Sequence, residues 1–197
     1  MRDGRGVVVD VGAGDGRAVV RRAAQSPHTL VIGIDASHPP LISTSRRASR
    51  PASKGGLPNA LFVLASAEAP PFELIGAAEV VTVTFPWGSL LRGVLGLDRA
   101  VVEGLAALVA PGGSLQALFS VEERDRTAVG PAGVPGAEAC MRDAFVTAGM
   151  RLVESREASQ ADVEASNSSW ARRLRVGRER RAWLALFRKD GRTGPIG

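Results

Sequence analysis

The stretch Val7-Val-Val-Asp-Val-Gly-Ala-Gly-Asp-Gly16 decides the fold of this chain. A β-branched apolar run followed by three glycines at alternate positions predicts a buried strand that turns sharply into a helix. Glycine has no Cβ and tolerates a positive φ, so Gly12, Gly14 and Gly16 allow the backbone to approach a ligand closely. The sequence therefore begins at a ligand-binding loop.

Segments of strand type and helix type alternate along the rest of the chain. After the opening strand, further strands are expected at 30–35, 61–65, 80–85, 114–120, 151–157 and 182–187. Helices are expected at 17–25, 37–47, 90–110 and 137–148, and a basic loop at 50–59. This alternation predicts an α/β fold with a seven-stranded, mostly parallel sheet and helices on both faces.

The length and composition indicate one soluble globular domain. The chain has 197 residues, of which 45% are hydrophobic and 23% charged, and we expect a single domain over 1–197 with a flexible tail from about 190. No apolar run is long enough for a membrane span, and the charged N-terminus does not resemble a secretory signal. With Cys140 as its one cysteine, the chain lacks a disulfide framework or a cysteine-based metal cluster, and we expect a cytoplasmic location.

The charge is more informative. The chain carries a net charge of +5 and a pI near 10.8, and its basic residues gather in two groups. One group consists of Arg46, Arg47, Arg50 and Lys54, and the other of Arg172, Arg173, Arg175, Arg178, Arg180 and Arg181. Each group alone is also compatible with a solvated surface, but two groups together favour a nucleic-acid partner.

Two aspartates indicate which ligand the glycine loop holds. Asp35 ends the second expected strand, 19 residues after Gly16, where an acidic residue binds ribose hydroxyls. The glycine spacing, however, is not the G-x-G-x-x-G of dinucleotide-binding proteins. Asp10, two residues before Gly12, would repel a pyrophosphate but suits an ammonium group, directly or through water. S-Adenosylmethionine carries both a ribose and an ammonium group, whereas a nicotinamide oxidoreductase is the weaker alternative.

At this point the chain resembles the class I methyltransferases, whose first motif is D/E-x-G-x-G-x-G, over nearly its whole length. The resemblance implies a Rossmann-like fold, S-adenosylmethionine as cofactor and S-adenosylhomocysteine as product. It also places Ala67 and Glu68, after the third strand, around the adenine ring of the cofactor; the alternative for Glu68 is a surface residue. The implied cofactor-binding residues are Asp10, Gly12, Ala13, Gly14, Asp35, Ala67, Glu68, Thr84, Pro86 and Ser89.

Substrate information is expected after the fourth strand, in Phe85-Pro-Trp-Gly-Ser-Leu-Leu91. Enzymes of this class that methylate exocyclic amines often carry a D/N-P-P-Y/F motif there, and the polar first residue is missing here. Ring nitrogens such as adenine N1 need no proton removed before attack, so positioning supplies most of the catalysis. Trp87 is thus a candidate for stacking on a base, although a tryptophan is also often buried in a core.

A second candidate lies in Asn167-Ser-Ser-Trp-Ala-Arg-Arg-Leu174, between the sixth and seventh strands. Trp170 has polar and basic neighbours, which is typical of a stacking platform with arginines for phosphates beside it. Trp183, in contrast, has apolar neighbours and is assigned to the core. The loop of Trp170 is expected on the same edge of the sheet as the other strand ends.

These segments together resemble a narrow family, the aminoglycoside-resistance 16S rRNA methyltransferases that modify N1 of adenine 1408 (the KamB and NpmA type). The resemblance implies that Trp87 and Trp170 sandwich an adenine flipped out of the decoding site of the 30S subunit, with Ser89 and Ser168 nearby. It assigns Arg173, Arg178 and Arg180 to the RNA backbone, whereas the Arg46 group matches only by location and charge. Methylation at N1 would block aminoglycoside binding.

Family members usually have an N-terminal β-hairpin ahead of the first strand, and only six residues precede Val7 here. This indicates either a misassigned start or docking through less surface. We expect a monomer that needs no metal ion. The alternatives are a methyltransferase acting on another rRNA or tRNA base, including guanine N7 at the same ribosomal site, one acting on a small molecule, and an RNA-binding module without activity.

Overall fold

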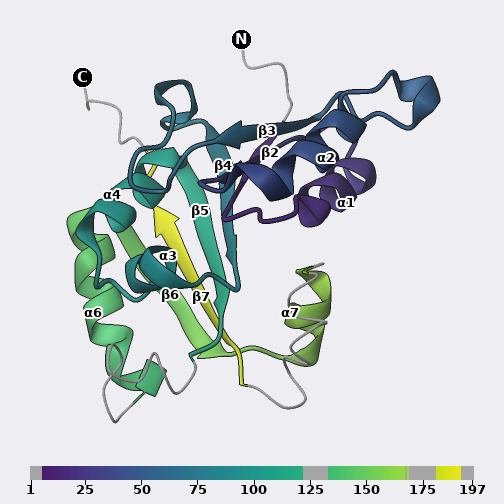
Figure 1. Ribbon diagram of the computed structural model, residues 1–197. Helices are drawn as coiled ribbons and strands as arrows, with labels where there is room; N and C mark the ends of the chain where they lie inside the picture. The colour runs from purple at the N-terminus through teal and green to yellow at the C-terminus, as the bar shows by residue number, and fades with distance from the viewer. Residues whose placement is uncertain (1–5, 122–132, 167, 169–180, 192–197) are drawn as a thin grey trace, which may run out of the picture.

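The computed structural model describes residues 6–121, 133–166, 168 and 181–191. They contain a seven-stranded sheet in the order β3-β2-β1-β4-β5-β7-β6 (Figure 1). The strands are β1 (Val7–Val11), β2 (Leu30–Asp35), β3 (Ala60–Leu64), β4 (Ala78–Thr84), β5 (Val109–Phe119), β6 (Met150–Glu157) and β7 (Trp183–Lys189). β7 is antiparallel to both neighbours, whereas the other pairs are parallel. The predicted mostly parallel sheet is confirmed.

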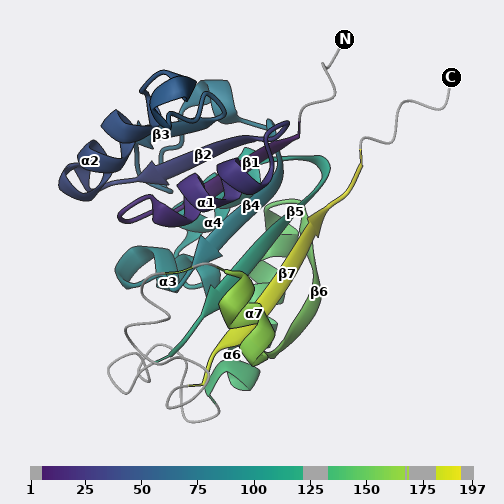
Figure 2. The same ribbon diagram turned by 90° about the vertical axis from the view of Figure 1, so that its right-hand side faces the viewer.

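The helices lie on both faces of this sheet (Figure 2). One face carries α1 (Arg17–Gln25), α2 (His38–Ala48) and the short α7 (Gln160–Ala165), and the other carries α3 (Gly88–Val94), α4 (Arg99–Leu108) and α6 (Gly133–Thr147). Two 3-10 helices, η1 (Ala52–Lys54) and η2 (Phe72–Leu74), lie in connections. None of the helices that the structure describes is long and apolar enough to span a membrane.

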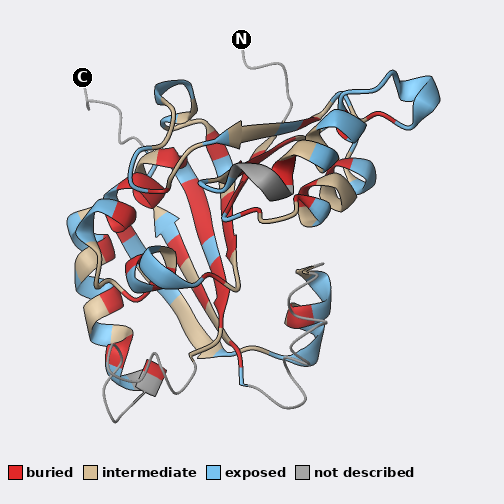
Figure 3. Cartoon of the chain, viewed as in Figure 1, coloured by how far each residue is buried: buried red, intermediate tan, exposed pale blue. Residues whose placement is uncertain are grey.

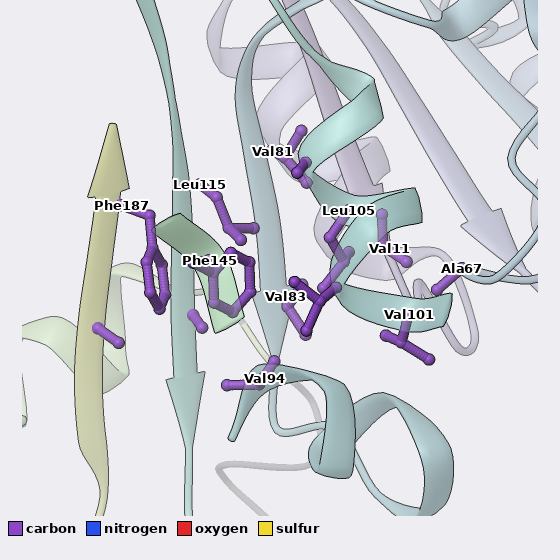
Figure 4. Packing of buried hydrophobic residues seen from close by; sticks show 14 of the residues in the cluster. Val11, Ala67, Val81, Val83, Val94, Val101, Leu105, Leu115, Phe145 and Phe187 are labelled. Atoms are coloured by element: carbon purple, nitrogen blue, oxygen red, sulfur yellow. The ribbon is translucent and has the colours of Figure 1, made fainter. Parts of the chain in front are cut away.

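The main hydrophobic core fills the space between the central strands and α3, α4 and α6 (Figures 3 and 4). Val9, Val81 and Leu115 lie on neighbouring strands and are fully buried. Successive side chains of a strand point to opposite faces of the sheet, and these three point into the core. Phe145 of α6 and Phe187 of β7 pack with their ring centroids 4.0 Å apart. This packing fixes the strands whose carboxyl ends form the site.

The connection between β6 and β7 reaches the same edge of the sheet as the carboxyl ends of β1 to β5. Trp183, the first residue of β7, pairs both with Phe119 at the end of β5 and with Glu157 at the end of β6. The connection therefore begins and ends at this edge, as the sequence predicts. It includes α7, which was not predicted; the expected loop at 50–59 likewise contains η1.

The prediction of a single helix over 90–110 is wrong, because the structure has two helices there. The break falls between α3 and α4, where Gly96 adopts a φ of 78°. Asp98 then caps α4 by accepting a hydrogen bond from the backbone N–H of Val101 at 3.4 Å. The turn at Gly96 and the cap at Asp98 were missed because apolar residues continue at helical spacing through both helices. They do so because the two helices pack on one another and share a buried face.

The start of the fifth strand is also corrected, from 114 to Val109. Val109 pairs with Ala78, and the register then jumps so that Ser114 pairs with Val80. Pro111, Gly112 and Gly113 lie in this irregular part of β5, where Gly112 has a φ of 79°. The Pro-Gly-Gly motif therefore interrupts a strand instead of ending a helix.

Lys189, at the end of β7, binds the junction between α4 and β5. Its Nζ donates hydrogen bonds to the carbonyl oxygens of Ala106 at 2.9 Å and Val109 at 3.0 Å. Burial lowers the pKa of the Lys189 ammonium. The Ala106 carbonyl also accepts a hydrogen bond from the backbone N–H of Val109, so the lysine adds a second donor there and links the end of α4 to the start of β5.

Lys189→Met is therefore expected to reduce the free energy of unfolding by about 1–3 kcal/mol, because the two hydrogen bonds from the ammonium group are lost. Chemical denaturation measures this loss. Arg188→Met, at the exposed neighbouring position, serves as the control and should change stability by less than about 0.5 kcal/mol. Equal effects of the two variants would contradict the role assigned to Lys189.

Candidate functional site

A cavity of about 230 Å³ opens at the carboxyl edge of the sheet. Its wall comes from four segments that are far apart in the sequence: the glycine loop after β1, the end of β2, the segment after β3, and the segment from β4 into α3. The lining residues include Gly12, Gly14, Asp35, Ala36, Ser66, Ala67, Glu68, Phe85, Pro86, Trp87, Ser89 and Leu90. Seven of the ten residues predicted to bind the cofactor are in this wall.

Asp35 ties the glycine loop to the end of β2. One carboxylate oxygen accepts a hydrogen bond from the backbone N–H of Gly14 and the other from that of Ser37, both at 2.7 Å. A carboxylate has about four acceptor positions, so two remain available for the hydroxyls of a ribose. The cavity thus presents an anionic acceptor where the second strand ends.

The glycines give the loop its shape. Gly12 and Gly14 have φ angles of 76° and 57°, a region that residues with a Cβ rarely adopt. A Cβ on Gly14 would meet no atom within 4 Å and would project into open space. The loop therefore leaves room beside its backbone, and with Asp35 it fits a nucleoside cofactor.

Asp10 lies beneath the cavity and is not part of the described wall; neither are Ala13 and Thr84, which were also predicted to bind the cofactor. The carboxylate of Asp10 is buried and accepts a hydrogen bond from the Thr82 hydroxyl at 2.7 Å. Burial raises the pKa of Asp10 above its ordinary value of 3.8, although Thr82 and Arg22 oppose the shift. Contact with an ammonium group, directly or through water, remains the prediction for Asp10.

The raised pKa of Asp10 predicts a pH-dependent stability. Between the ordinary and the raised pKa, the unfolded chain is ionised while the folded protein keeps the proton, so folding becomes less favourable as the pH rises. Asp10→Asn lacks this penalty. Melting temperatures measured upward from about pH 4 should therefore shift in favour of the variant until the pH passes the raised pKa of Asp10, and then differ by a constant amount. A difference that is constant over the whole pH range would contradict this account.

Glu68 and Ser89 join the two sides of the cavity. The hydrogen bonds that lower the pKa of Glu68 come from its own backbone N–H and from the hydroxyls of Ser89 and Ser66. Ser89 belongs to the first turn of α3, whereas Glu68 follows β3, so the pair fixes α3 relative to the far wall. Ala67 is buried beside Glu68. The carboxylate is thus held in its ionised form at the cavity.

Trp87 is a prominent feature of the site because it is 79% exposed. The possibility that Trp87 belongs to the core is therefore excluded. The residue lies at the N-cap of α3, directly after the buried Pro86, and its side chain borders the cavity. A large aromatic surface at the mouth of a cavity can stack on a planar ligand. Trp183, in contrast, packs against the main core, as predicted.

The second predicted stacking residue, Trp170, lies outside the described residues, as do Arg173, Arg178 and Arg180. Ser168 is described and half-buried; its backbone N–H donates to the Ser166 hydroxyl at 3.2 Å. Ser168 follows α7 and lies at the carboxyl edge of the sheet. The structure thus describes one of the five predicted substrate residues of this connection, together with α7, which precedes it.

The first basic group forms an exposed patch at one end of the sheet. Arg46 and Arg47 lie in the last turn of α2, Arg50 follows it, and Lys54 lies in η1; all four side chains are exposed. No acidic residue occurs anywhere between Asp35 and Glu68. The positive charge of this patch is therefore not neutralised by its own part of the chain, which suits a polyanionic partner.

Several wall residues were not predicted from the sequence, namely Ala36, Ser66, Phe85 and Leu90. Ala36 and Ser66 could have been found, because each adjoins a predicted residue at the end of a strand. Phe85 carried no usable signal: it has a φ of 48°, and a phenylalanine before a proline is expected to be extended.

Comparison with known proteins gives a consistent result. The family model described as NpmA, 16S rRNA (adenine(1408)-N(1))-methyltransferase, matches residues 1–188. A 16S rRNA (adenine(1408)-N(1))-methyltransferase from Streptoalloteichus tenebrarius is 37% identical over 186 residues, covering 91% of this chain and 85% of the relative. An Escherichia coli protein of the same name is 31% identical, covering 94% and 86% of the two chains.

Solved structures agree with the sequence relatives. The W203A mutant of the 16S rRNA (adenine(1408)-N(1))-methyltransferase from Catenulisporales acidiphilia, in complex with its cosubstrate SAM, superposes with a TM-score of 0.82 at 31% identity. The match covers 96% of this chain and 88% of that one. The 16S rRNA methyltransferase KamB also gives a TM-score of 0.82, at 34% identity, covering 94% and 88%.

Proposed function

The chain belongs to the family of 16S rRNA (adenine(1408)-N(1))-methyltransferases, and from this premise we propose that it methylates N1 of adenine 1408 in the 16S rRNA of the 30S subunit. S-Adenosylmethionine supplies the methyl group. The observation that carries the proposal is the exposed Trp87 at the mouth of a cavity that fits a nucleoside cofactor. The product protects the ribosome, because a methylated, cationic N1 lies on the base edge that aminoglycosides contact.

Cofactor binding is assigned to the cavity wall. Asp35 accepts hydrogen bonds from the ribose hydroxyls while it holds Gly14, and the open space beside the backbone of Gly14 accommodates the rest of the nucleoside. Ala67 and Glu68 contact the adenine ring. Asp10 provides negative charge beneath the loop for the ammonium group of the methionine part. These roles follow the predicted positions and are supported by the placement of the wall.

Catalysis requires no base on the protein. The in-plane lone pair of adenine N1 forms the new N–C bond, and the electron pair of the broken C–S bond stays on sulfur. The positive charge passes from sulfur to the base, so no proton has to leave before attack. The task of the protein is to hold the adenine at the correct distance and to exclude water.

Trp87 performs this holding by stacking on the flipped adenine, and we propose Trp170 as the second stacking residue. Flipping a base out of a helix costs a few kcal/mol, and each aromatic stack returns about 1–3 kcal/mol. Two stacks are therefore enough to offset the flipping cost. Ser89 and Ser168 are proposed to lie next to the base and the cofactor.

Docking on the subunit is assigned to the basic residues. Arg46, Arg47, Arg50 and Lys54 lie along α2 and η1, on one side of the cavity. Arg173, Arg178 and Arg180 are proposed to contact the RNA backbone close to the flipped base. Binding should weaken steeply with salt, since each phosphate contact releases counterions.

Transfer of a labelled methyl group to purified ribosomal particles tests this proposal. We expect incorporation into 30S subunits and no incorporation into 50S subunits or tRNA. Naked 16S rRNA should be a poor substrate, because docking uses the folded surface of the subunit. Labelling of tRNA, or of a small molecule in preference to the 30S subunit, would contradict the proposal.

A further inference from the structure

Phe85 has a backbone conformation that its residue type disfavours. Its φ of 48° makes it the one non-glycine residue with a positive φ among those that the structure describes. In this region the Cβ crowds the backbone carbonyl, and a residue that precedes proline normally adopts an extended conformation instead. Surrounding contacts must therefore hold Phe85 in place, and such outliers gather at functional sites.

The contacts of Phe85 identify what holds it. Its backbone N–H donates to the carbonyl oxygen of Leu118, at the end of β5, at 2.6 Å. Its ring packs against a small separate cluster formed by Leu118, Val163 of α7 and Ala182 just before β7, joined by Ala158. Phe85 thus fastens the end of β4 to the connection between β6 and β7.

That connection is itself anchored at its base. The backbone N–H of Ala158 donates to the carbonyl of Ala182 at 2.8 Å, which closes the two ends of the connection on each other. Arg156 of β6 binds both carboxylate oxygens of Asp162 in α7, at 2.7 and 3.1 Å. Ser159 and Asp162 also form a capping box at the start of α7. The ring of Phe85 therefore rests on a supported surface.

The turn at Phe85 decides how the next two residues point. Pro86 is buried, whereas Trp87 is 79% exposed at the mouth of the cavity. A residue with an ordinary extended backbone at position 85 would send the chain in another direction. The orientation of Trp87 thus depends on a strained residue whose side chain packs against the cluster of Leu118, Val163 and Ala182.

We propose that Phe85 is a positioning residue for the substrate base: bonded to Leu118 and packed against the cluster of Leu118, Val163 and Ala182, it holds Trp87 in place relative to the ends of β5, β6 and β7. The proposal rests on the proposed function, in which Trp87 stacks on the adenine. It adds that the ring of Phe85, and not its strained backbone alone, keeps the two sides of the base-binding site in register.

Tryptophan fluorescence tests the positioning role without any substrate. The chain has three tryptophans and no tyrosine, so Trp170→Phe with Trp183→Phe leaves Trp87 as the one strong emitter. In that background, Phe85→Ala should increase the fast local component of the Trp87 anisotropy decay, and Phe85→Leu, which keeps most of the apolar volume, should not. Phe72→Ala, which removes a ring that is 86% exposed elsewhere, is the matched control.

Kinetics on the 30S subunit provide the second measurement, in the protein with all three tryptophans. Phe85→Ala should lower kcat by about 10- to 100-fold, as expected for misplacement of a reacting group by about 1 Å, and Phe85→Leu should restore most of it. Because Phe85 also borders the cofactor cavity, a second variant, Val163→Ala, reduces the cluster against which Phe85 packs without changing the cavity wall. It should lower kcat in the same direction with an unchanged Kd for S-adenosylmethionine.

The outcomes separate this proposal from the proposed function. Wild-type kcat in Phe85→Ala, or a loss of kcat while Trp87 stays as ordered as before, overturns the positioning role. A wild-type protein that does not methylate 30S subunits overturns the proposed function instead, and the anisotropy of Trp87 still reports on Phe85. Greater mobility of Trp87 with a lower kcat, rescued by leucine, supports the proposal.

Discussion

Trp87→Ala is expected to reduce kcat/KM for methylation of the 30S subunit by about 5- to 150-fold, the equivalent of one lost base–aromatic stack of about 1–3 kcal/mol. Trp87 is 79% exposed at the mouth of the cavity, so its removal costs little folding energy. The Kd for S-adenosylmethionine should change by less than about threefold, because the aromatic surface serves the base and the polar contacts serve the cofactor.

Two further substitutions at this position separate stacking from simple bulk. Trp87→Phe keeps an aromatic plane and should retain more activity than Trp87→Leu, which keeps only an apolar side chain. The kinetic constants on 30S subunits and a calorimetric cofactor titration check these expectations together. A leucine variant as active as the phenylalanine variant, or wild-type turnover in the alanine variant, would refute the stacking role.

Asp35→Ala is expected to weaken cofactor binding by about 10- to 150-fold, since hydrogen bonds to a charged group contribute about 1.5–3 kcal/mol. The carboxylate of Asp35 holds the backbone N–H groups of Gly14 and Ser37 at 2.7 Å and is proposed to bind the ribose as well. The substitution therefore removes a ligand contact and loosens the glycine loop at the same time.

Asp35→Asn should weaken binding in the same direction, because its NH2 group faces an N–H donor at either Gly14 or Ser37. Calorimetric titration with S-adenosylmethionine measures both variants. Asp143→Asn, on the exposed side of α6, is a control that removes the same charge away from the cavity. An Asp35→Ala protein with the cofactor affinity of the wild type would show that the ribose is held elsewhere.

Much of the fold could be predicted because its signals are local. α1 and β2 begin and end at the predicted residues. The apolar periodicity predicts both elements, and Asp35 marks the end of β2. The break between α3 and α4 could not be predicted in this way, because Gly96 and Asp98 sit inside a continuous helical pattern of apolar residues. The start of β5 at Val109 was missed for a related reason: its pairing with Ala78 is a tertiary contact.

The site was predictable where its residues follow strands. Asp35 ends β2, and Ala67 and Trp87 come shortly after the ends of β3 and β4. The parallel sheet brings such ends to one edge. The hydrogen bond between Asp35 and Gly14 joins residues 21 positions apart. It could not be predicted, because it depends on how the glycine loop folds back. The φ of Phe85 and its packing against the cluster of Leu118, Val163 and Ala182 likewise could not be predicted from residue type. They require β4, β5 and α7 to be assembled first.

The position of the methyl group on the rRNA tests the central claim most directly. After incubation of 30S subunits with the protein and S-adenosylmethionine, primer extension on the extracted 16S rRNA should stop next to adenine 1408, because a methyl group on N1 blocks Watson–Crick pairing. The stop should be absent without the cofactor. Read-through of adenine 1408 despite incorporation of label, with a stop or a mass change at another nucleotide, would contradict the account.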